Sequence, residues 1–463
     1  MTSRRYDAGM PPPETSAPER DRPSLLKRLV DLAVGLLYRS VEVFRHPTAT
    51  FSGPTIVIAN HFGGLADALL LVAALDDVPR ILARDRIWRI PLVRRLMDAV
   101  GAIPVHKPED RSTPVSNADM FTAAYAALAD GDTILIFPEG ITVDDPRIAR
   151  LKTGAARIAL GARADGVAGI QIVPIGLHYE DKAALRSRVS VIVGEPVDLD
   201  ATLAAMGVDA PTPDDRDLVR TLTDTFERRL REVAPDFENW REATDLTFAA
   251  EVALRAASAD PDRPVSLAER DRLANRLAQA PPEDRAGILA AVERYRRDLE
   301  AVGMSDRGTY RGMGTAEFLR HVAGTLLLGA ILVPFALVGI ATSIPPLLVI
   351  FGLGKLPVSP AVKATLKPAA ALVLFPLAWG VAAWRIVFEH LGPIWTIVAI
   401  GLVPLYLVAG IVITERVVLL WRALRAWRGR KGLREAAERI AAGRAAVVAA
   451  VATRSDDPAA PPG

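Results

Sequence analysis

The sequence predicts an α/β domain in the first half of the chain, followed by a helical connector and a C-terminal membrane region of α-helices. Between about residues 54 and 200, short β-rich runs such as "TIVIA", "TILIF" and "VSVIV" alternate with Ala- and Leu-rich helical stretches. Strands that are apolar along nearly their whole length need helices on both faces of the sheet. Residues 212–310 then change to a charged, alanine-rich helical pattern, and long uncharged runs follow.

These changes of pattern divide the chain into five predicted regions. They are a disordered N-terminus (1–24), the α/β domain with an N-terminal amphipathic helix (25–210), a helical connector (211–317), a membrane region (318–424) and a basic helical tail with a disordered end (425–463). The N-terminus is polar and proline-rich and lacks the apolar segment of a signal peptide. The spacing of apolar residues in 25–44 predicts one amphipathic helix, which suits either a membrane surface or the protein core.

The composition excludes several kinds of chemistry. Of the 463 residues, 56 are basic and 54 acidic, so the net charge of +2 provides no strong field for nucleic acid, and we expect no nucleic-acid partner. The chain has no cysteine, which excludes disulfides, thiolate metal sites and a cysteine nucleophile.

Three apolar runs mark the membrane region: 322–354, 368–384 and 391–414. A crossing needs about 20 apolar residues, so the first run is too long for one helix and too short for two full crossings. We expect its "SIPPLL" segment to break it into a membrane-buried hairpin.

Positive charge predicts the orientation of these segments. Lys355, Lys363 and Lys367 follow the first run, and "RALRAWRGRKGLR" follows the last. Positively charged flanks favour the cytosolic side, so we expect an integral membrane protein whose α/β domain faces the cytosol. Richness in Arg and Ala is typical of a GC-rich bacterium, which indicates the bacterial plasma membrane.

His61 stands where the apolar run "IVIAN" ends. A lone histidine is more often structural than catalytic, but here two glycines allow a turn and Asp67 then begins an apolar helical run. A carboxylate that accepts from one imidazole nitrogen leaves the other free to take a proton from a hydroxyl. Because no serine or cysteine adjoins the pair, we expect the imidazole to activate a substrate hydroxyl directly.

A second motif, "FPEGIT", breaks another strand around Glu139 and Gly140. A strand end followed by a Pro/Gly turn exposes backbone N–H groups that can hold an anion, although a solvent-facing turn is the simpler interpretation. Lys107, Lys152 and Arg157 follow or flank strand ends and would suit a phosphate. For Lys152 and Arg157 taken singly, solvated surface charge is the alternative.

Four blocks in this order, "NHFGGLAD", "GAIPVHKPED", "FPEGIT" and "IVPIGL", resemble the phospholipid/glycerol acyltransferase family, which includes lysophosphatidate and glycerol-3-phosphate acyltransferases. The resemblance covers roughly residues 54–200. It implies the glycerolipid acyltransferase fold and a membrane-bound O-acyltransferase of phospholipid biosynthesis. The enzyme would transfer a fatty acyl group to glycerol 3-phosphate or a lysophospholipid, which makes the lipid membrane and a phosphorylated glycerol acceptor its partners.

The resemblance also implies roles for individual residues. His61 would be the general base and Asp67 its orienting partner. Lys107, Glu139 and Gly140 would lie at the phosphate site of the acceptor, Thr142 would keep the hydroxyl of a usual serine, and Pro174 would shape the wall of the site. Since like charges repel, we expect Glu139 to orient basic or amide donors and not to bind phosphate itself. Acyl-CoA or acyl-ACP would be the substrate donor, with no cofactor and no metal.

The chain departs from the commonest family pattern at three positions, one of which is Thr142 in place of the usual serine. Five residues separate His61 from Asp67 where four are usual, a spacing that resembles the fungal-type glycerol-3-phosphate acyltransferases, which also carry hydrophobic C-terminal segments. Lys107 replaces the usual arginine, which keeps the charge but loses the bidentate fork.

Two other classes of function stay open at this point. A non-catalytic lipid-binding or membrane-scaffold protein could keep the acyltransferase fold, although the retention of His61, Asp67 and the FPEG turn argues against it. A transporter would need an ion pathway, for which the few charges near the apolar runs offer little. The acceptor stays open among glycerol 3-phosphate, dihydroxyacetone phosphate and lysophospholipids.

Overall fold

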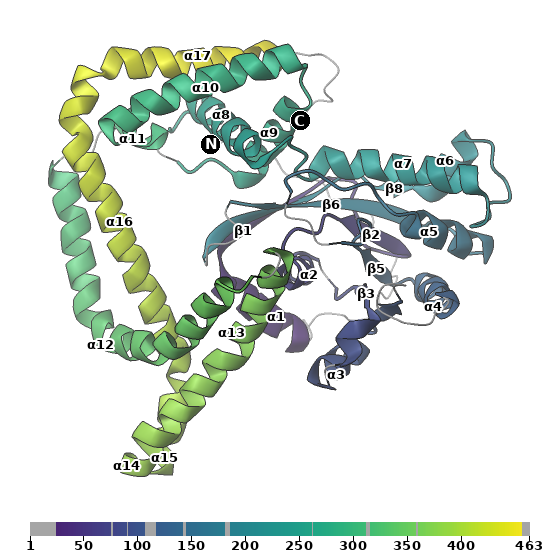
Figure 1. Cartoon of the computed structure of the whole chain (residues 1–463), viewed down its shortest axis with the longest axis horizontal. Coiled ribbons are helices and arrows are strands. Elements are labelled where there is room, and N and C mark those ends of the chain that lie inside the picture. Colours follow the sequence, from purple (N-terminus) through teal and green to yellow (C-terminus); the bar gives the residue numbers. More distant parts are fainter. Residues whose placement is uncertain are drawn as a thin grey trace, which may run out of the picture.

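The computed structural model describes residues 25–455 except positions 76, 90, 107–116, 142–144, 181–185, 262, 312–314 and 358–359. The predicted disordered N-terminus and the end of the tail after Ser455 lie outside the described residues. Figure 1 shows an α/β unit with a group of helices on one side of it and long helices that extend away from the sheet.

A mixed sheet forms the centre of the α/β unit. Its strands are β1 (Tyr38–Arg45), β2 (Thr55–Ala59), β3 (Arg80–Arg84), β4 (Ile103–Val105), β5 (Thr133–Ile136), β6 (Gln171–Tyr179), β7 (Ser187–Val193) and β8 (Val197–Asp198). They lie in the order β1-β7-β6-β2-β5-β3-β4, and β8 pairs with β6. Only β6–β7 and β6–β8 are antiparallel among these described pairs. The sheet with its flanking helices confirms the predicted α/β class.

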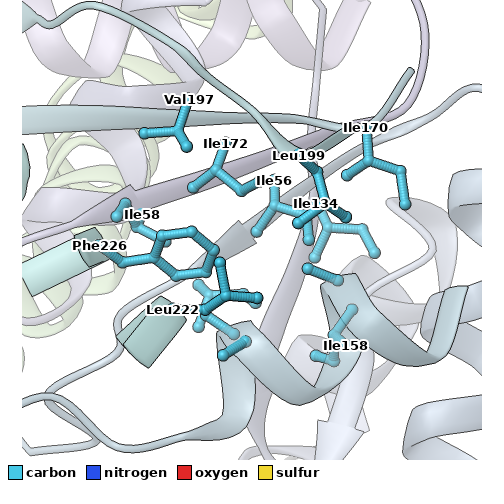
Figure 2. Close-up of a cluster of buried hydrophobic side chains, with 14 of the residues drawn as sticks. Ile56, Ile58, Ile134, Ile158, Ile170, Ile172, Val197, Leu199, Leu222 and Phe226 are labelled. Carbon is cyan, nitrogen blue, oxygen red and sulfur yellow. The ribbon is translucent and has the colours of Figure 1, made fainter. Parts of the chain in front are cut away.

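Helices cover both faces of this sheet. Along β2, Ile56 and Ile58 face one core and Val57 and Ala59 face the other, as the two-residue repeat of a strand requires. Figure 2 shows Ile56 and Ile58 close to Phe226, which belongs to α7. The first core is covered by α4 (Ala118–Ala129), α5 (Gly154–Ala164) and α7 (Arg216–Val233), and the second by α1 (Leu25–Leu37) and α2 (Leu65–Ala74).

The predicted helix at 25–44 is wrong in its second half. The helix α1 ends at Leu37, and Tyr38–Arg45 form strand β1, which pairs in parallel with β7. The alternating pattern of "YRSVEVFR" is compatible with a strand as well as with a helix. Pairing with β7 stabilises the strand. Of the two environments considered for α1, the core receives Val30 and Val34, while Leu32 stays 60% exposed.

The connector helices pack with the C-terminal tail. The helices are α8 (Trp240–Ala257), α9 (Leu267–Ala278), α10 (Pro282–Val302) and α17 (Ala437–Ser455). Ile440, Val447 and Val451 of α17 are buried in one core with residues of α8, α9 and α10. The basic tail is thus a packed part of this helical group, and the limits of the five regions stay a prediction.

The remaining helical elements are shorter or belong to the membrane region. They are η1 (Asp85–Arg89), α3 (Pro91–Ala99), α6 (Leu199–Ala205), α11 (Asp306–Arg311), α12 (Thr315–Gly354), α13 (Pro360–Ala382), η3 (Ala383–Phe388), α14 (Glu389–Leu391), α15 (Pro393–Gly401) and α16 (Val403–Glu435).

The predicted hairpin in the first apolar run is wrong. The helix α12 is continuous over this run although it contains Pro334, Pro345 and Pro346. Proline removes a backbone N–H and kinks a helix, and the rest of the helical hydrogen bonds can continue past it. Figure 1 shows α12 changing direction along its length. The third apolar run is also not one segment, because Leu402 separates α15 from α16.

Two helices within the described part of the chain are long and apolar enough to cross a membrane, Phe318–Gly354 and Val403–Trp421. These parts of α12 and α16 pack against each other (Figure 1). The helix α13 lies nearer the α/β unit and contacts α2.

A carboxylate of α16 is tied to the α/β unit. Glu415 Oε1 accepts from Arg39 Nε at 3.3 Å and from Arg186 Nη2 at 3.1 Å. Arg186 also donates from Nη1 to the carbonyls of Gly35 and Tyr38, at 2.5 and 3.0 Å. Its own backbone is left-handed, with φ at 62°, which L-residues rarely adopt. Arg186 therefore joins the α1–β1 junction to α16.

Candidate active site

The candidate site is built around the carboxyl end of β2. This strand ends at Ala59, and the side chain of Asn60 then replaces its pairing with β6. Asn60 Nδ2 donates to the Leu177 carbonyl at 3.1 Å, and its Oδ1 accepts from the Leu177 N–H at 2.7 Å. This fixed residue leads directly into His61.

His61 and Asp67 form the predicted pair. The His61 Nδ1 to Asp67 Oδ2 distance is 2.9 Å, although the chain has one more residue between them than the commonest family pattern. Gly64 accommodates the turn with a φ of 63° and precedes α2, whose first turn carries Asp67. The longer spacing therefore preserves the contact.

The Asp67 carboxylate is completely buried and hydrogen-bonded on both oxygens. Oδ2 also accepts from the Gly63 N–H at 2.8 Å, and Oδ1 accepts from the Tyr179 hydroxyl. The N-terminus of α2 adds a favourable dipole. Each Asp67 oxygen thus accepts from a neighbouring donor, and Oδ2 accepts the proton of His61 Nδ1–H.

Gly63 has no space for a side chain. A Cβ at this position would lie 2.7 Å from Asp67 Oδ1 and 2.8 Å from the Tyr179 hydroxyl. The two glycines of the first motif are thus needed for different reasons. Gly63 allows the close approach of Asp67 and Tyr179, and Gly64 adopts the left-handed backbone of the turn.

The imidazole of His61 is held by packing and faces outward in part. It stacks on Phe137 with ring centroids 4.1 Å apart, and its side chain is 20% exposed. Among the described residues, His61 has no hydrogen-bond partner at Nε2. With Nδ1–H donating to Asp67, Nε2 carries the lone pair that can accept a proton.

Glu139 holds the backbone of this histidine. It is buried, its Oε1 accepts from the His61 N–H at 2.9 Å, and its Oε2 accepts from the Ala149 N–H at 3.1 Å. Burial raises the pKa of Glu139 above its usual value, and the two N–H bonds lower it in part. Both carboxylate oxygens thus hold backbone N–H groups, and the orienting role of Glu139 in catalysis stays a prediction.

Gly140 and Lys152 lie together beside the FPEG turn. Gly140 has a φ of 66°, and its N–H donates to the Phe137 carbonyl at 3.0 Å. The Lys152 stem passes over it, since a Cβ on Gly140 would lie 3.2 Å from Lys152 Cε. Lys152 itself is exposed, just before α5. A basic side chain thus stands next to the turn that holds His61.

Arg157 and Pro174 lie in other surroundings. The Arg157 guanidinium is 5.2 Å from the Phe121 ring centroid and 3.9 Å from Asp214, on the side of α4 and α7. Pro174 is buried in β6 opposite Ile58 of β2, three positions before His61. None of these contacts of Arg157 and Pro174 involves His61 or Asp67. Lys107 and Thr142, the other predicted binding residues, lie outside the described residues.

The sequence interpretation missed Tyr179, Phe137 and Asn60. Tyr179 ends β6, the strand of the fourth block, and Phe137 begins the FPEG turn. Both follow directly from strands already assigned to the site, so strand-end position was the available signal. Within the described part of the chain, no cluster of three or more His, Asp or Glu side chains could hold a metal ion.

The α/β fold carries a His–Asp pair and an FPEG turn at adjacent strand ends. The family model described as Acyltransferase matches residues 38–178.

Two named proteins and one solved structure are also similar to part of this chain. Glycerol-3-phosphate O-acyltransferase 2 of Saccharomyces cerevisiae is 33% identical over 125 residues, 27% of this chain and 17% of the yeast protein. Lyso-ornithine lipid O-acyltransferase of Rhizobium meliloti is 28% identical over 165 residues, 35% of this chain and 52% of that protein. The chain therefore spans only part of the length of these relatives. The solved 1-acyl-sn-glycerophosphate (LPA) acyltransferase PlsC of Thermotoga maritima aligns at 19% identity with a TM-score of 0.33, over 45% of this chain and 77% of that one.

Proposed function

We propose that the protein is a membrane-bound O-acyltransferase that transfers a fatty acyl group from an acyl thioester to glycerol 3-phosphate or a lysophospholipid. The observation that carries this proposal is the His61–Asp67 pair, in which a buried carboxylate holds Nδ1 at 2.9 Å and leaves Nε2 as a base. The acyltransferase domain match at residues 38–178 supports the same reaction class.

The proposed reaction has one chemical step on the enzyme. Nε2 of His61 takes the proton of the acceptor hydroxyl as the oxygen attacks the thioester carbonyl carbon. The C–O bond forms, the C–S bond breaks, and the thiolate leaves and takes up the proton that the imidazolium releases. Asp67 stabilises the imidazolium between these events. The step needs neither a metal nor a redox cofactor.

The acceptor is proposed to carry its phosphate near the FPEG turn. Lys152 is the described cation there, and Lys107 is a further cation predicted from sequence. A phosphate contact with a lysine is a point-charge interaction, so several headgroups could fit. Acyl-CoA and acyl-ACP are both proposed donors.

An acyl-transfer assay tests the proposal. Purified protein in lipid nanodiscs would receive radiolabelled acyl-CoA or acyl-ACP with glycerol 3-phosphate, dihydroxyacetone phosphate, lysophosphatidate or a lyso-ornithine lipid. We expect a labelled lipid product with a phosphorylated acceptor and its loss in His61→Ala. Bound lipid without transfer to any acceptor would favour the non-catalytic lipid-binding alternative.

The proposed location is the bacterial plasma membrane, with the acyltransferase domain in the cytosol. It is supported by the basic end of α16. Because the chain has no cysteine, single cysteines can be labelled selectively at position 206, which is exposed in the α/β unit, and at position 389. In intact cells an impermeant reagent should label position 389 and leave position 206 unlabelled. The reverse pattern would overturn the orientation.

A further inference from the structure

Two tyrosines stand behind the Asp67 carboxylate, on the side away from His61. Tyr179 at the end of β6 donates its hydroxyl proton to Asp67 Oδ1. Tyr38 at the start of β1 packs next to it, with its ring centroid 6.1 Å from that of Tyr179. Burial raises the pKa of both phenols, so both keep their protons at neutral pH.

The two oxygens of Asp67 are held by different partners. Oδ2 receives both His61 Nδ1–H and the Gly63 N–H. Among the described residues, the hydrogen bond to Oδ1 comes from Tyr179. The terminal torsion of an aspartate is broad, so a donor on Oδ1 decides how the carboxylate plane is turned. Correct rotation directs the Oδ2 lone pair at His61.

The backbone that carries Tyr38 is itself held in place by hydrogen bonds from Arg186. Arg186 donates to the Tyr38 carbonyl at 3.0 Å, and its backbone N–H donates to the Leu37 carbonyl at 2.8 Å. These bonds set the position at which α1 ends and β1 begins. The backbone position from which the Tyr38 side chain extends is therefore fixed.

We propose that Tyr179, supported by Tyr38, is a positioning residue for acyl transfer, because its hydroxyl fixes the Asp67 carboxylate in the orientation that serves His61. This inference rests on the proposed function. Loss of the Tyr179 hydroxyl frees the carboxylate plane and concentrates the negative charge toward the imidazolium. The proton transfer then becomes less well aligned, and the basicity of His61 rises.

The test compares Tyr179→Phe, Tyr38→Phe and Tyr295→Phe in the full chain. Tyr295 is a matched control, because its buried hydroxyl donates to Asp306 Oδ1 at 2.6 Å in the connector. Steady-state acyl transfer would be measured across pH. Histidine NMR of the same samples would follow the titration of His61, with His61→Ala identifying its signal among the six histidines.

We expect kcat of Tyr179→Phe to fall about tenfold, with both KM values within about twofold of wild type. The acidic limb of the kcat/KM profile and the NMR titration of His61 should both move to higher pH. Tyr38→Phe should shift the same quantities less, and Tyr295→Phe should leave them unchanged.

Each other outcome has a defined meaning. Wild-type kcat and an unmoved His61 titration in Tyr179→Phe would overturn the inference while His61→Ala stays inactive. If Tyr179→Phe does not fold, Tyr38→Phe decides by the same two measurements. If the wild-type protein transfers no acyl group, the proposed function fails, and the NMR titration still decides whether Tyr179 controls the pair.

Discussion

Two His–Asp pairs among the described residues have nearly the same geometry. His61 Nδ1 lies 2.9 Å from Asp67 Oδ2, and His106 Nδ1 lies 3.0 Å from Asp85 Oδ2. Both histidine side chains are 20% exposed. Each pair follows a strand of the same sheet, β2 for His61 and β4 for His106.

The surroundings of the two pairs differ. Asp67 is fully buried at the start of a ten-residue helix, with Gly63 and Tyr179 as further donors. Asp85 is 9% exposed and belongs to the short helix η1. In the strand order, β2 is central and β4 is terminal. A His–Asp distance alone therefore does not define a site, and the burial of the carboxylate, the length of its helix and the position of its strand in the sheet distinguish the two pairs.

The largest expected effect compares the two carboxylates. Asp67→Asn should reduce acyl-transfer kcat about a hundredfold to ten-thousandfold, because the amide cannot accept at both former oxygen positions and the imidazole loses its charged partner. Asp85→Asn should keep kcat within about threefold of wild type. Rates of both purified variants check this difference, and equal losses would show that both pairs take part in the reaction.

A smaller effect is expected from the groups that hold each histidine backbone. The His61 N–H donates to Glu139, whereas the His106 N–H donates to Asn117 Oδ1 at 2.9 Å and the His106 carbonyl accepts from Asn117 Nδ2 at 3.0 Å. In Glu139→Gln the side-chain oxygen can still accept from one of the two backbone N–H groups, those of His61 and Ala149. The NH₂ group then faces the other N–H and cannot accept from it.

Losing a hydrogen bond to a charged group costs about 1.5 to 3 kcal/mol, so kcat of Glu139→Gln should fall about ten- to hundredfold. Asn117→Asp makes the reverse change at His106, since a carboxylate replaces an amide and the donor to the His106 carbonyl is lost, and it should alter kcat less than threefold. Circular dichroism of both variants controls for folding. A Glu139→Gln enzyme with wild-type kcat would contradict the orienting role of Glu139.

The smallest effect concerns a third histidine that has no carboxylate at hydrogen-bond distance among the described residues. His178 is buried, and its Nε2–H donates to the Val233 carbonyl at 2.6 Å. Burial lowers its pKa, with Asp271 opposing and Arg270 adding to the shift. The neutral form is thus favoured in the folded state, and its contribution to stability is present above the unfolded pKa and is lost as pH falls.

As pH falls below about 6.5, the ordinary pKa of a histidine, this group should lower the free energy of unfolding by up to about 1.4 kcal/mol per pH unit until it is protonated in the folded state as well. Thermal unfolding followed by tryptophan fluorescence in detergent would measure the slope. His178→Gln keeps a donor for Val233 and should flatten this slope, whereas substitution of the partly exposed His46 should not. An unchanged slope in His178→Gln would assign the pH dependence to other groups.

Much of the site could be predicted because its residues follow apolar strands. "TIVIA" and "TILIF" identified β2 and β5, and strand ends of a parallel sheet meet at one edge, so His61, Asp67 and Glu139 were placed correctly relative to one another. Tyr179 is 112 positions from Asp67, and only the pairing of β6 with β2 brings them together. Sequence spacing contains no information about such a contact.

The errors have physical causes of the same kind. The boundary between α1 and β1 depends on pairing with β7, which lies about 150 residues further along the chain. The packing of α17 depends on apolar faces of α8 and α10 that a distant basic tail does not reveal. The hairpin in α12 was expected from prolines, yet proline changes the direction of a helix more readily than it ends an apolar one.

In the proposed membrane location, the ion pairs of Glu415 would fix how far α16 enters the bilayer. A carboxylate paired with Arg39 and Arg186 of the α/β unit would lie outside hydrocarbon, because ionised groups are costly there. From Val403 to Glu415 a helix rises only about 18 Å, less than the roughly 30 Å of a bilayer core. Pro393–Gly401 would then supply the rest of this crossing, which the break at Leu402 divides into two helices. The distance between the sheet and the lipid would therefore be set by the contact of Glu415 with Arg39 and Arg186.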